Sequence, residues 1–222
     1  MVDRLLLVEG EADRAFFEML CRSNTILAGV RVAPPVEVGG RKNTKQGILN
    51  MLETLINDLN DGRLQALAIV VDADRISDGG GFSNTIKQIT QKVASLGYDR
   101  SPQVLATGGL LYQHNDGLPD FGVWVMPDNA AEGMLEDWIK QTVSLTEQPL
   151  LIEAKNTVAS LTAPKFKTVR LSKAEVATWL AWQEKPGEGL YYAIEGQLLD
   201  VAAPLYTGLV NWLKAVFPAQ NS

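Results

Sequence analysis

Hydrophobic positions along the chain alternate between short apolar runs and longer stretches with helical spacing. Apolar residues are nearly continuous at 3–9 and in LQALAIVVDADR at 64–75, which predicts strands that are buried on both faces. Apolar residues recur every three to four positions at 11–22, 45–59 and 83–96, which predicts helices. The alternation of these elements predicts an α/β fold with a mostly parallel sheet flanked by helices.

The pattern is less regular between these elements and after them. A strand near 30–38 is interrupted by Pro34 and Pro35, which is typical of an edge or bent strand. The segments PQVLATGG (102–109) and FGVWVMP (121–127) predict two strands around an antiparallel hairpin excursion.

The last part of the chain is helical in tendency. The segment DNAAEGMLEDWIKQTV (128–143) predicts a helix with acidic first turns, and no strand pattern follows it. We therefore expect an α/β core over 1–143 and a helical C-terminal extension over 144–222 that packs on this core. A single continuous domain is the alternative.

Composition limits the classes of protein that need to be considered. The chain has 222 residues, 46% hydrophobic and 21% charged, which is typical of a folded globular protein with a substantial core. The single cysteine, Cys21, excludes an internal disulfide framework and indicates a reducing compartment. Neither a secretory signal nor an apolar stretch of membrane-spanning length is present, so we expect a cytoplasmic protein without membrane contact. A net charge of -6 argues against a general nucleic-acid coat protein and leaves room for a local basic patch.

Carboxylates follow the two strongest predicted strands. Glu9 ends the first strand, and Asp72 and Asp74 end the buried strand that we expect beside it. In an open parallel sheet, ligands bind at the carboxyl ends of the strands. If the strand continues, Asp72 and Asp74 project from the same side. Carboxylates that lie close together either have raised pKa values or are neutralised by a cation. A set of oxygen ligands without histidine or cysteine favours Mg²⁺ or Mn²⁺ over zinc.

Other residues could take part in binding a phosphate. Gly10 would allow a tight strand-to-helix turn and the close approach of a phosphate to the helix N-terminus. Arg41, Lys42 and Lys45 in the GGRKNTK loop could hold phosphates, or the loop could simply be solvated. Lys173, in a basic stretch, could stabilise a transition state, and the alternative is an ordinary charged surface.

Two motifs carry a resemblance to a known domain. The segment LLVEGEAD followed by AIVVDAD resembles the Toprim domain, in which a glutamate and glycine end one strand and Asp-x-Asp follows another. The resemblance implies a Rossmann-like core and a magnesium ion for phosphoryl transfer on nucleic acids. It also implies that Glu9 is a general acid or base, that Asp72 and Asp74 bind metal, and that Asp13 is an accessory ligand.

Longer segments extend the resemblance over most of the chain. The segments at 121–138, 178–194 and 212–217 are similar to those of small stand-alone Toprim-like proteins whose function is uncharacterised. Nucleases that overcome lysogenization defects have a late acidic element that supports a second metal. That similarity implies such a role for Glu132 or Glu136, which share a face at i and i+4 if both lie on one helix.

The resulting hypothesis is Mg²⁺-dependent phosphoryl transfer of the Toprim type, with cleavage of a nucleic-acid phosphodiester, DNA or RNA, as the leading reaction. The alternative is a module that binds metal, phosphate or nucleic acid without turnover, and a third class is an interaction protein with a decayed site. No Walker phosphate loop occurs in the sequence, so an ATPase partner would have to act in trans.

Overall fold

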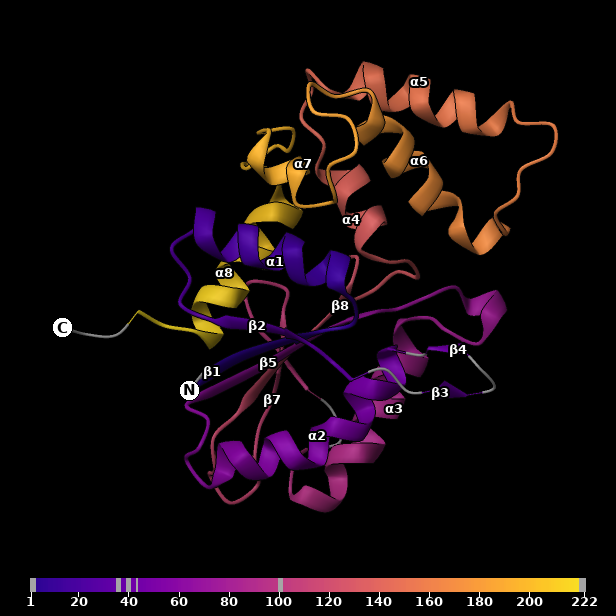
Figure 1. Ribbon diagram of the computed structural model, residues 1–222. Helices are drawn as coiled ribbons and strands as arrows, with labels where there is room; N and C mark the ends of the chain where they lie inside the picture. The colour runs from indigo at the N-terminus through magenta and orange to yellow at the C-terminus, as the bar shows by residue number, and fades with distance from the viewer. Residues whose placement is uncertain (1–2, 35–36, 39–40, 43, 100–101, 220–222) are drawn as a thin grey trace.

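A computed structural model describes residues 3–34, 37–38, 41–42, 44–99 and 102–219. Its centre is a six-stranded sheet with the order β2-β1-β5-β8-β7-β6 (Figure 1). The strands are β1 (Arg4–Val8), β2 (Gly29–Val32), β5 (Ala66–Asp72), β6 (Gln103–Val104), β7 (Leu110–Tyr112) and β8 (Phe121–Met126). Strands β2, β1, β5 and β8 are parallel, and β7 is antiparallel to both β8 and β6. The predicted mostly parallel α/β fold is confirmed.

Helices cover both faces of this sheet, as Figure 1 shows. On one face lie α2 (Thr44–Asn60) and α3 (Phe82–Val93), and on the other lie α1 (Glu11–Ser23), α4 (Leu135–Thr142) and α8 (Pro204–Val216). Leu5 and Leu7 of β1 belong to the hydrophobic cluster with α2 and α3, whereas Leu6 and Val8 belong to the opposite cluster. The continuous apolar run of β1 thus follows from burial on both faces.

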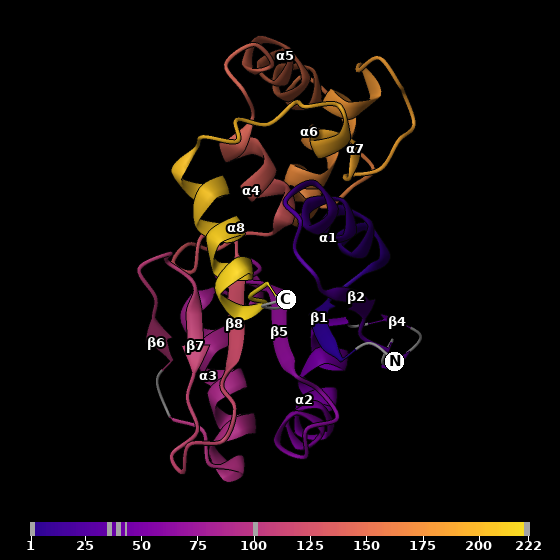
Figure 2. The ribbon, with the colours of Figure 1, turned by 90° about the vertical axis from the view of Figure 1, so that its left-hand side faces the viewer.

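The C-terminal part is helical and contains α5 (Gln148–Ala159), α6 (Leu171–Ala181) and α7 (Tyr192–Glu195), followed by α8. Helices α5, α6 and α7 gather at one end of the sheet, whereas α8 runs along a face of the sheet (Figure 2). Trp179 of α6 and Trp212 of α8 are fully buried in the same cluster as Trp124 of β8. The division into 1–143 and 144–222 stays a prediction. In the described part of the chain, no helix is long and apolar enough to cross a membrane.

Short elements complete the chain. Three 3-10 turns are η1 (Ile76–Asp78), η2 (Ala94–Leu96) and η3 (Thr168–Arg170), and a separate antiparallel pair is formed by β3 (Glu37–Val38) and β4 (Arg41–Lys42). The predicted strand at 30–38 is therefore divided, because β2 ends at Val32, just before Pro34. Strand β7 lies between the two strands predicted at 102–109 and 121–127, within the expected hairpin excursion.

The expected helix at 128–143 begins only at Leu135. Asp128 Oδ1 instead accepts the Ala130 and Ala131 N–H groups at 3.0 and 2.7 Å, which stabilises a turn. Asp137 Oδ2 accepts the Met134 N–H at 3.1 Å and caps the helix. The first half of the predicted helix is therefore a loop.

Candidate functional site

The carboxyl ends of β1 and β5 meet as the sequence predicts. The two strands are parallel neighbours, and β2 lies on the other side of β1. The chain therefore adds β2 on one side of β1 and β5 on the other, so the strand order reverses between β1 and β5. Glu9 Oε1 accepts the Asp72 N–H at 2.9 Å and so connects the two strand ends. Both residues are partly buried.

The N-termini of two helices contribute to the same place. Asp13, in the first turn of α1, accepts the Gly10 N–H through Oδ2 at 2.9 Å. Asp72 Oδ1 accepts the Leu135 N–H at the start of α4 at 3.1 Å. Gly10 has φ -138° and ψ 171°, an extended conformation that any residue can adopt, so this turn does not require glycine for its backbone angles.

A cation from α6 and an acid from α4 border this group. Lys173 Nζ donates to Glu136 Oε1 at 2.9 Å. Glu136 is only 5% exposed, and its Oε2 is buried without a hydrogen-bond partner among the described residues. Burial raises the pKa values of Asp13 and Asp72, and the positive charge of Lys173 opposes this rise, which indicates that Lys173 lies near both carboxyl groups. The structure thus brings together Lys173 and Glu136, two candidate residues that lie 37 positions apart in the chain.

The carboxyl groups are shifted towards their protonated forms. Burial raises the pKa of Glu9 to about 7, although Lys45 and the Asp72 N–H oppose this rise. Burial also raises the pKa of Asp13 to about 6, against the effect of Lys173. The pKa of Asp72 is raised well above its ordinary value, first by burial and then by the charges of Glu9 and Asp13. These acids therefore keep their protons to a higher pH than exposed carboxyl groups do.

Asp74 does not lie with Asp72 as expected. Strand β5 ends at Asp72, and Asp74 has a left-handed φ of 60°. Its backbone forms an isolated bridge with Gly133, and the Asp74 N–H donates to the Gly133 carbonyl at 2.9 Å. Its Oδ2 is 2.5 Å from Lys45 Nζ of α2. The condition on which both aspartates were predicted to project from one side is not met, because the strand does not continue past Asp72.

The late acidic pair is also separated. Glu132 lies in the loop before α4, is exposed, and accepts the Ile76 N–H through Oε2 at 2.6 Å. Only Glu136 lies on the helix, so the expected shared face at i and i+4 is wrong. The backbone of Arg41 and Lys42 forms β4, and the positions of these side chains lie outside the described residues.

The donor chemistry of this site suits a hard divalent cation. Glu9, Asp13, Asp72 and Glu136 offer only carboxylate oxygens, including the unpartnered Glu136 Oε2. In the arrangement described, however, one oxygen of each of these carboxylates is engaged with an N–H group or a lysine. No group of three or more acids, histidines or cysteines is gathered as a metal site among the described residues. The residue types thus fit Mg²⁺ or Mn²⁺, although the side chains are not gathered around one point in this arrangement.

Comparison with known proteins gives the family of the chain. A family described as "protein of unknown function (DUF3226)" matches residues 3–218. The chain belongs to the DUF3226 family. No curated protein and no solved structure matches it significantly. The description of DUF3226 assigns no activity, so the Toprim relation stays a prediction that rests on the motifs.

A polar network that the sequence pattern does not predict joins α4 to α6 in this DUF3226 protein. Lys140 Nζ contacts Asp137 Oδ1 at 3.1 Å and Glu175 Oε2 at 2.7 Å, and the Ser172 hydroxyl donates to Asp137 Oδ1 at 2.5 Å. This network holds the helix of Lys173 against the helix of Glu136. Only the i,i+3 spacing of Asp137 and Lys140 was visible in the sequence.

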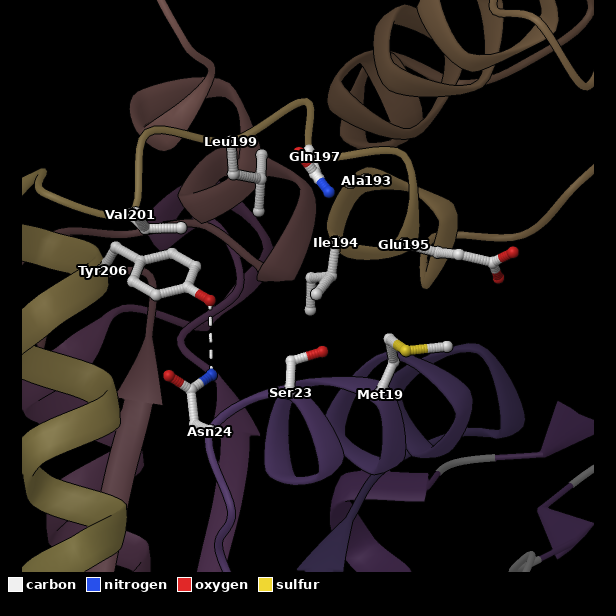
Figure 3. A pocket seen from close by; sticks show the side chains of 10 residues that line it. All are labelled: Met19, Ser23, Asn24, Ala193, Ile194, Glu195, Gln197, Leu199, Val201 and Tyr206. Carbon is white, nitrogen blue, oxygen red and sulfur yellow. Dashed lines mark hydrogen bonds between the residues drawn. The ribbon is translucent and has the colours of Figure 1, made fainter.

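A separate hollow of about 700 Å³ lies between the C-terminal end of α1 and the segment from α7 to α8 (Figure 3). Met19, Ile194 and Leu199 are among its apolar wall residues. Asn24 Nδ2 donates to the Tyr206 hydroxyl at 3.3 Å. The carboxylates lie at the opposite end of α1, a helix of 13 residues that is about 20 Å long at 1.5 Å per residue. The hollow is therefore distinct from the candidate site.

Proposed function

We propose that the carboxylates at the ends of β1 and β5 bind Mg²⁺ or Mn²⁺ and that the protein carries out phosphoryl transfer of the Toprim type. Cleavage of a nucleic-acid phosphodiester is the leading reaction. The observation that supports this proposal is that Glu9, Asp13 and Asp72 lie together at the carboxyl ends of the parallel strands β1 and β5. Burial raises the pKa values of all three.

In this proposal Glu9, Asp13 and Asp72 hold the metal ion, with Glu136 as a further ligand. The bound ion would neutralise charge on the phosphate oxygens. The Toprim resemblance also assigns Glu9 a role as general acid or base, and in the metal-free protein burial raises the pKa of its carboxyl group to about 7. Lys173 Nζ, which is 45% exposed as a side chain, would stabilise negative charge that develops on the phosphate.

The nucleic acid would be held by local positive charge, since the whole chain has a net charge of -6. Lys167 and Arg170 precede Lys173 around the start of α6, so the basic stretch continues from the proposed site. An ATPase or another protein partner acting in trans remains part of this proposal.

A binding module without turnover is the second candidate. The ion pair between Lys45 and Asp74 favours it, because this pair already neutralises one of the carboxylates that the Toprim resemblance assigns to metal binding. Such a module would bind a metal or a phosphate but would not cleave a nucleic acid.

Calorimetry with Mn²⁺ tests the proposal before any substrate is known. We expect the unmodified protein to bind Mn²⁺, and the variants Glu9→Gln and Asp72→Asn to lose this binding. Glu153→Gln, which changes an exposed acid of α5, is the matched control and should bind as the unmodified protein does.

Labelled DNA and RNA incubated with Mn²⁺ or Mg²⁺ then separate the two candidates. Cleavage that Asp72→Asn abolishes supports an enzyme, and metal binding without cleavage supports the binding module. Cleavage that is unchanged in Asp72→Asn would show that the assignment of the site is wrong.

A further inference from the structure

The Lys45 ammonium group is surrounded by oxygen atoms beyond the end of β5. Its Nζ is 2.5 Å from Asp74 Oδ2 and 3.5 Å from both the Ala73 carbonyl oxygen and Thr85 Oγ1. The Lys45 side chain is only 14% exposed, and Thr85 is 3% exposed. A positive charge is thus held in a largely buried position among a carboxylate, a carbonyl and a hydroxyl oxygen.

These oxygens come from parts of the fold that pack firmly. Lys45 lies in the first turn of α2, Ala73 and Asp74 follow β5, and Thr85 lies in the first part of α3. Helices α2 and α3 pack side by side on the same face of the sheet (Figure 1). Carboxylate, carbonyl and hydroxyl oxygens are also the ligands that hard divalent cations prefer. The protein therefore places its own cation among oxygens that suit a metal ion.

The charge of Lys45 also acts on Glu9. Among the groups that oppose the raised pKa of Glu9, Lys45 has the largest effect, and Asp74 acts in the opposite direction. Lys45 therefore lies near Glu9, which the proposed function assigns to metal binding, and near Asp74, which the Toprim resemblance assigns to it. It compensates part of the negative charge of both acids.

We infer that Lys45 is a built-in counter-cation of the strand-end acids, which a divalent metal ion must displace from Asp74 in order to bind there. This inference rests on the proposed function, because it extends the metal site proposed at Glu9 to the neighbouring Asp74. Lys45 is a positioning residue in this scheme: it keeps Asp74 neutralised until a metal ion arrives.

A place for the displaced ammonium group lies beside its present position. A polar hollow of about 200 Å³ is lined by Lys45 and Asp74 together with Gln46, Gly80, Asn84 and Gln88. The long, flexible lysine stem can turn the ammonium group towards this hollow without moving α2. A displaced Lys45 would then be available to a phosphate oxygen of the substrate.

Mn²⁺ calorimetry on the full chain at pH 8 is the first test, because this pH lies above the Glu9 pKa of about 7 and proton competition is small. Lys45→Met retains the length of the side chain and removes the charge. We expect it to bind Mn²⁺ more tightly, by about tenfold or more, because a competing unit charge has been removed. Lys45→Arg should bind no more tightly than the unmodified protein. Lys87→Met, at an exposed position of α3, is the matched control and should leave the affinity unchanged.

The second test uses the unmodified protein and needs no variant to fold. Reductive methylation of lysines is followed by mass spectrometry with and without Mn²⁺. We expect Mn²⁺ to accelerate methylation of Lys45 several-fold, because the displaced ammonium group becomes accessible, and to leave methylation of Lys87 unchanged.

The outcomes separate this inference from the proposed function. Equal Mn²⁺ affinity of the unmodified protein and Lys45→Met, with unchanged methylation, would overturn the inference and leave the metal site intact. Mn²⁺ binding by Lys45→Met alone would support the inference in its strongest form. If neither protein binds Mn²⁺, the proposed function and the inference both fall.

Discussion

Replacement of Lys173 by methionine would remove the cation that contacts a buried acid. Lys173 Nζ donates to Glu136 Oε1 at 2.9 Å, and Glu136 is 5% exposed. Glu136 Oε2 already has no hydrogen-bond partner among the described residues. The substitution would therefore leave both oxygens of the Glu136 carboxylate without a hydrogen-bond partner among these residues. Methionine retains most of the apolar stem, so the main change is the loss of charge.

The expected loss of stability follows from the burial of the two partners. Removal of one member of a buried ion pair lowers the free energy of unfolding by about 3–5 kcal/mol. The Lys173 side chain is 45% exposed, so water can partly replace it, and we expect about 2–3 kcal/mol. For a chain of this size, that corresponds to a decrease in Tm of roughly 4–12 °C.

Thermal and urea unfolding, followed by circular dichroism, would measure this loss. The double variant Lys173→Met with Glu136→Gln should recover part of the stability, because it removes both charges of the pair. With the Glu136→Gln single variant it completes a double-mutant cycle, for which we expect a coupling free energy of about 1–3 kcal/mol. Lys155→Met, at an exposed position of α5, is the control and should change stability by less than about 0.5 kcal/mol.

Two results would refute this reasoning. A Tm of Lys173→Met equal to that of the unmodified protein would mean that the buried carboxylate does not depend on Lys173. A coupling free energy of zero would mean that the contact between α4 and α6 contributes no stability through this pair.

Four further predictions follow from the site and the core. Because protons compete for Glu9 (pKa about 7) and Asp13 (pKa about 6), Mn²⁺ affinity measured by calorimetry should increase from about pH 5 to pH 8, and a flat profile would contradict this. Both pKa values exceed their ordinary values of 4.5 and 3.8, so between about pH 4 and pH 7 the folded metal-free chain binds more protons than the unfolded chain. The folded chain should therefore lose stability as pH rises through this range. Glu9→Gln should make this dependence shallower in urea unfolding. Gly109→Val would force a side chain into the Trp212 ring and should lower the free energy of unfolding by about 1–3 kcal/mol. An unchanged free energy of unfolding would mean that α8 moves aside without cost. A chain truncated after Val143 should lose its cooperative thermal transition, because the buried cluster on one face of the sheet includes side chains from α5, α6 and α8; a sharp transition would instead support an independent core.

Much of the fold could be predicted because burial leaves a local pattern. The runs around β1 and β5 are apolar on both faces, and the helical spacing at 11–22 and 45–59 corresponds to α1 and α2. The boundary of α4 could not be predicted in this way, because the turn at Asp128 and the cap at Asp137 compete with a helical pattern that looks continuous.

Only the part of the candidate site whose residues end neighbouring strands could be predicted from the sequence. Glu9 and Asp72 meet because each ends a strand and the two strands are parallel neighbours. The pairing of Lys45 with Asp74 depends on how α2 packs beside the end of β5, and the left-handed φ of Asp74 turns it away from the direction of the strand.

The sequence by itself therefore determined the α/β class, the main elements and the acidic strand ends, since hydrophobic periodicity and residue type are local properties. Only the tertiary structure decided which cations these acids meet. Lys45 and Lys173 lie far from Asp74 and Glu136 in the chain, and each pair forms only because separate helices pack in one particular arrangement. Burial, which raises the pKa of Glu9 to about 7, is likewise a property of the assembled fold. It arises from side chains that no short segment contains.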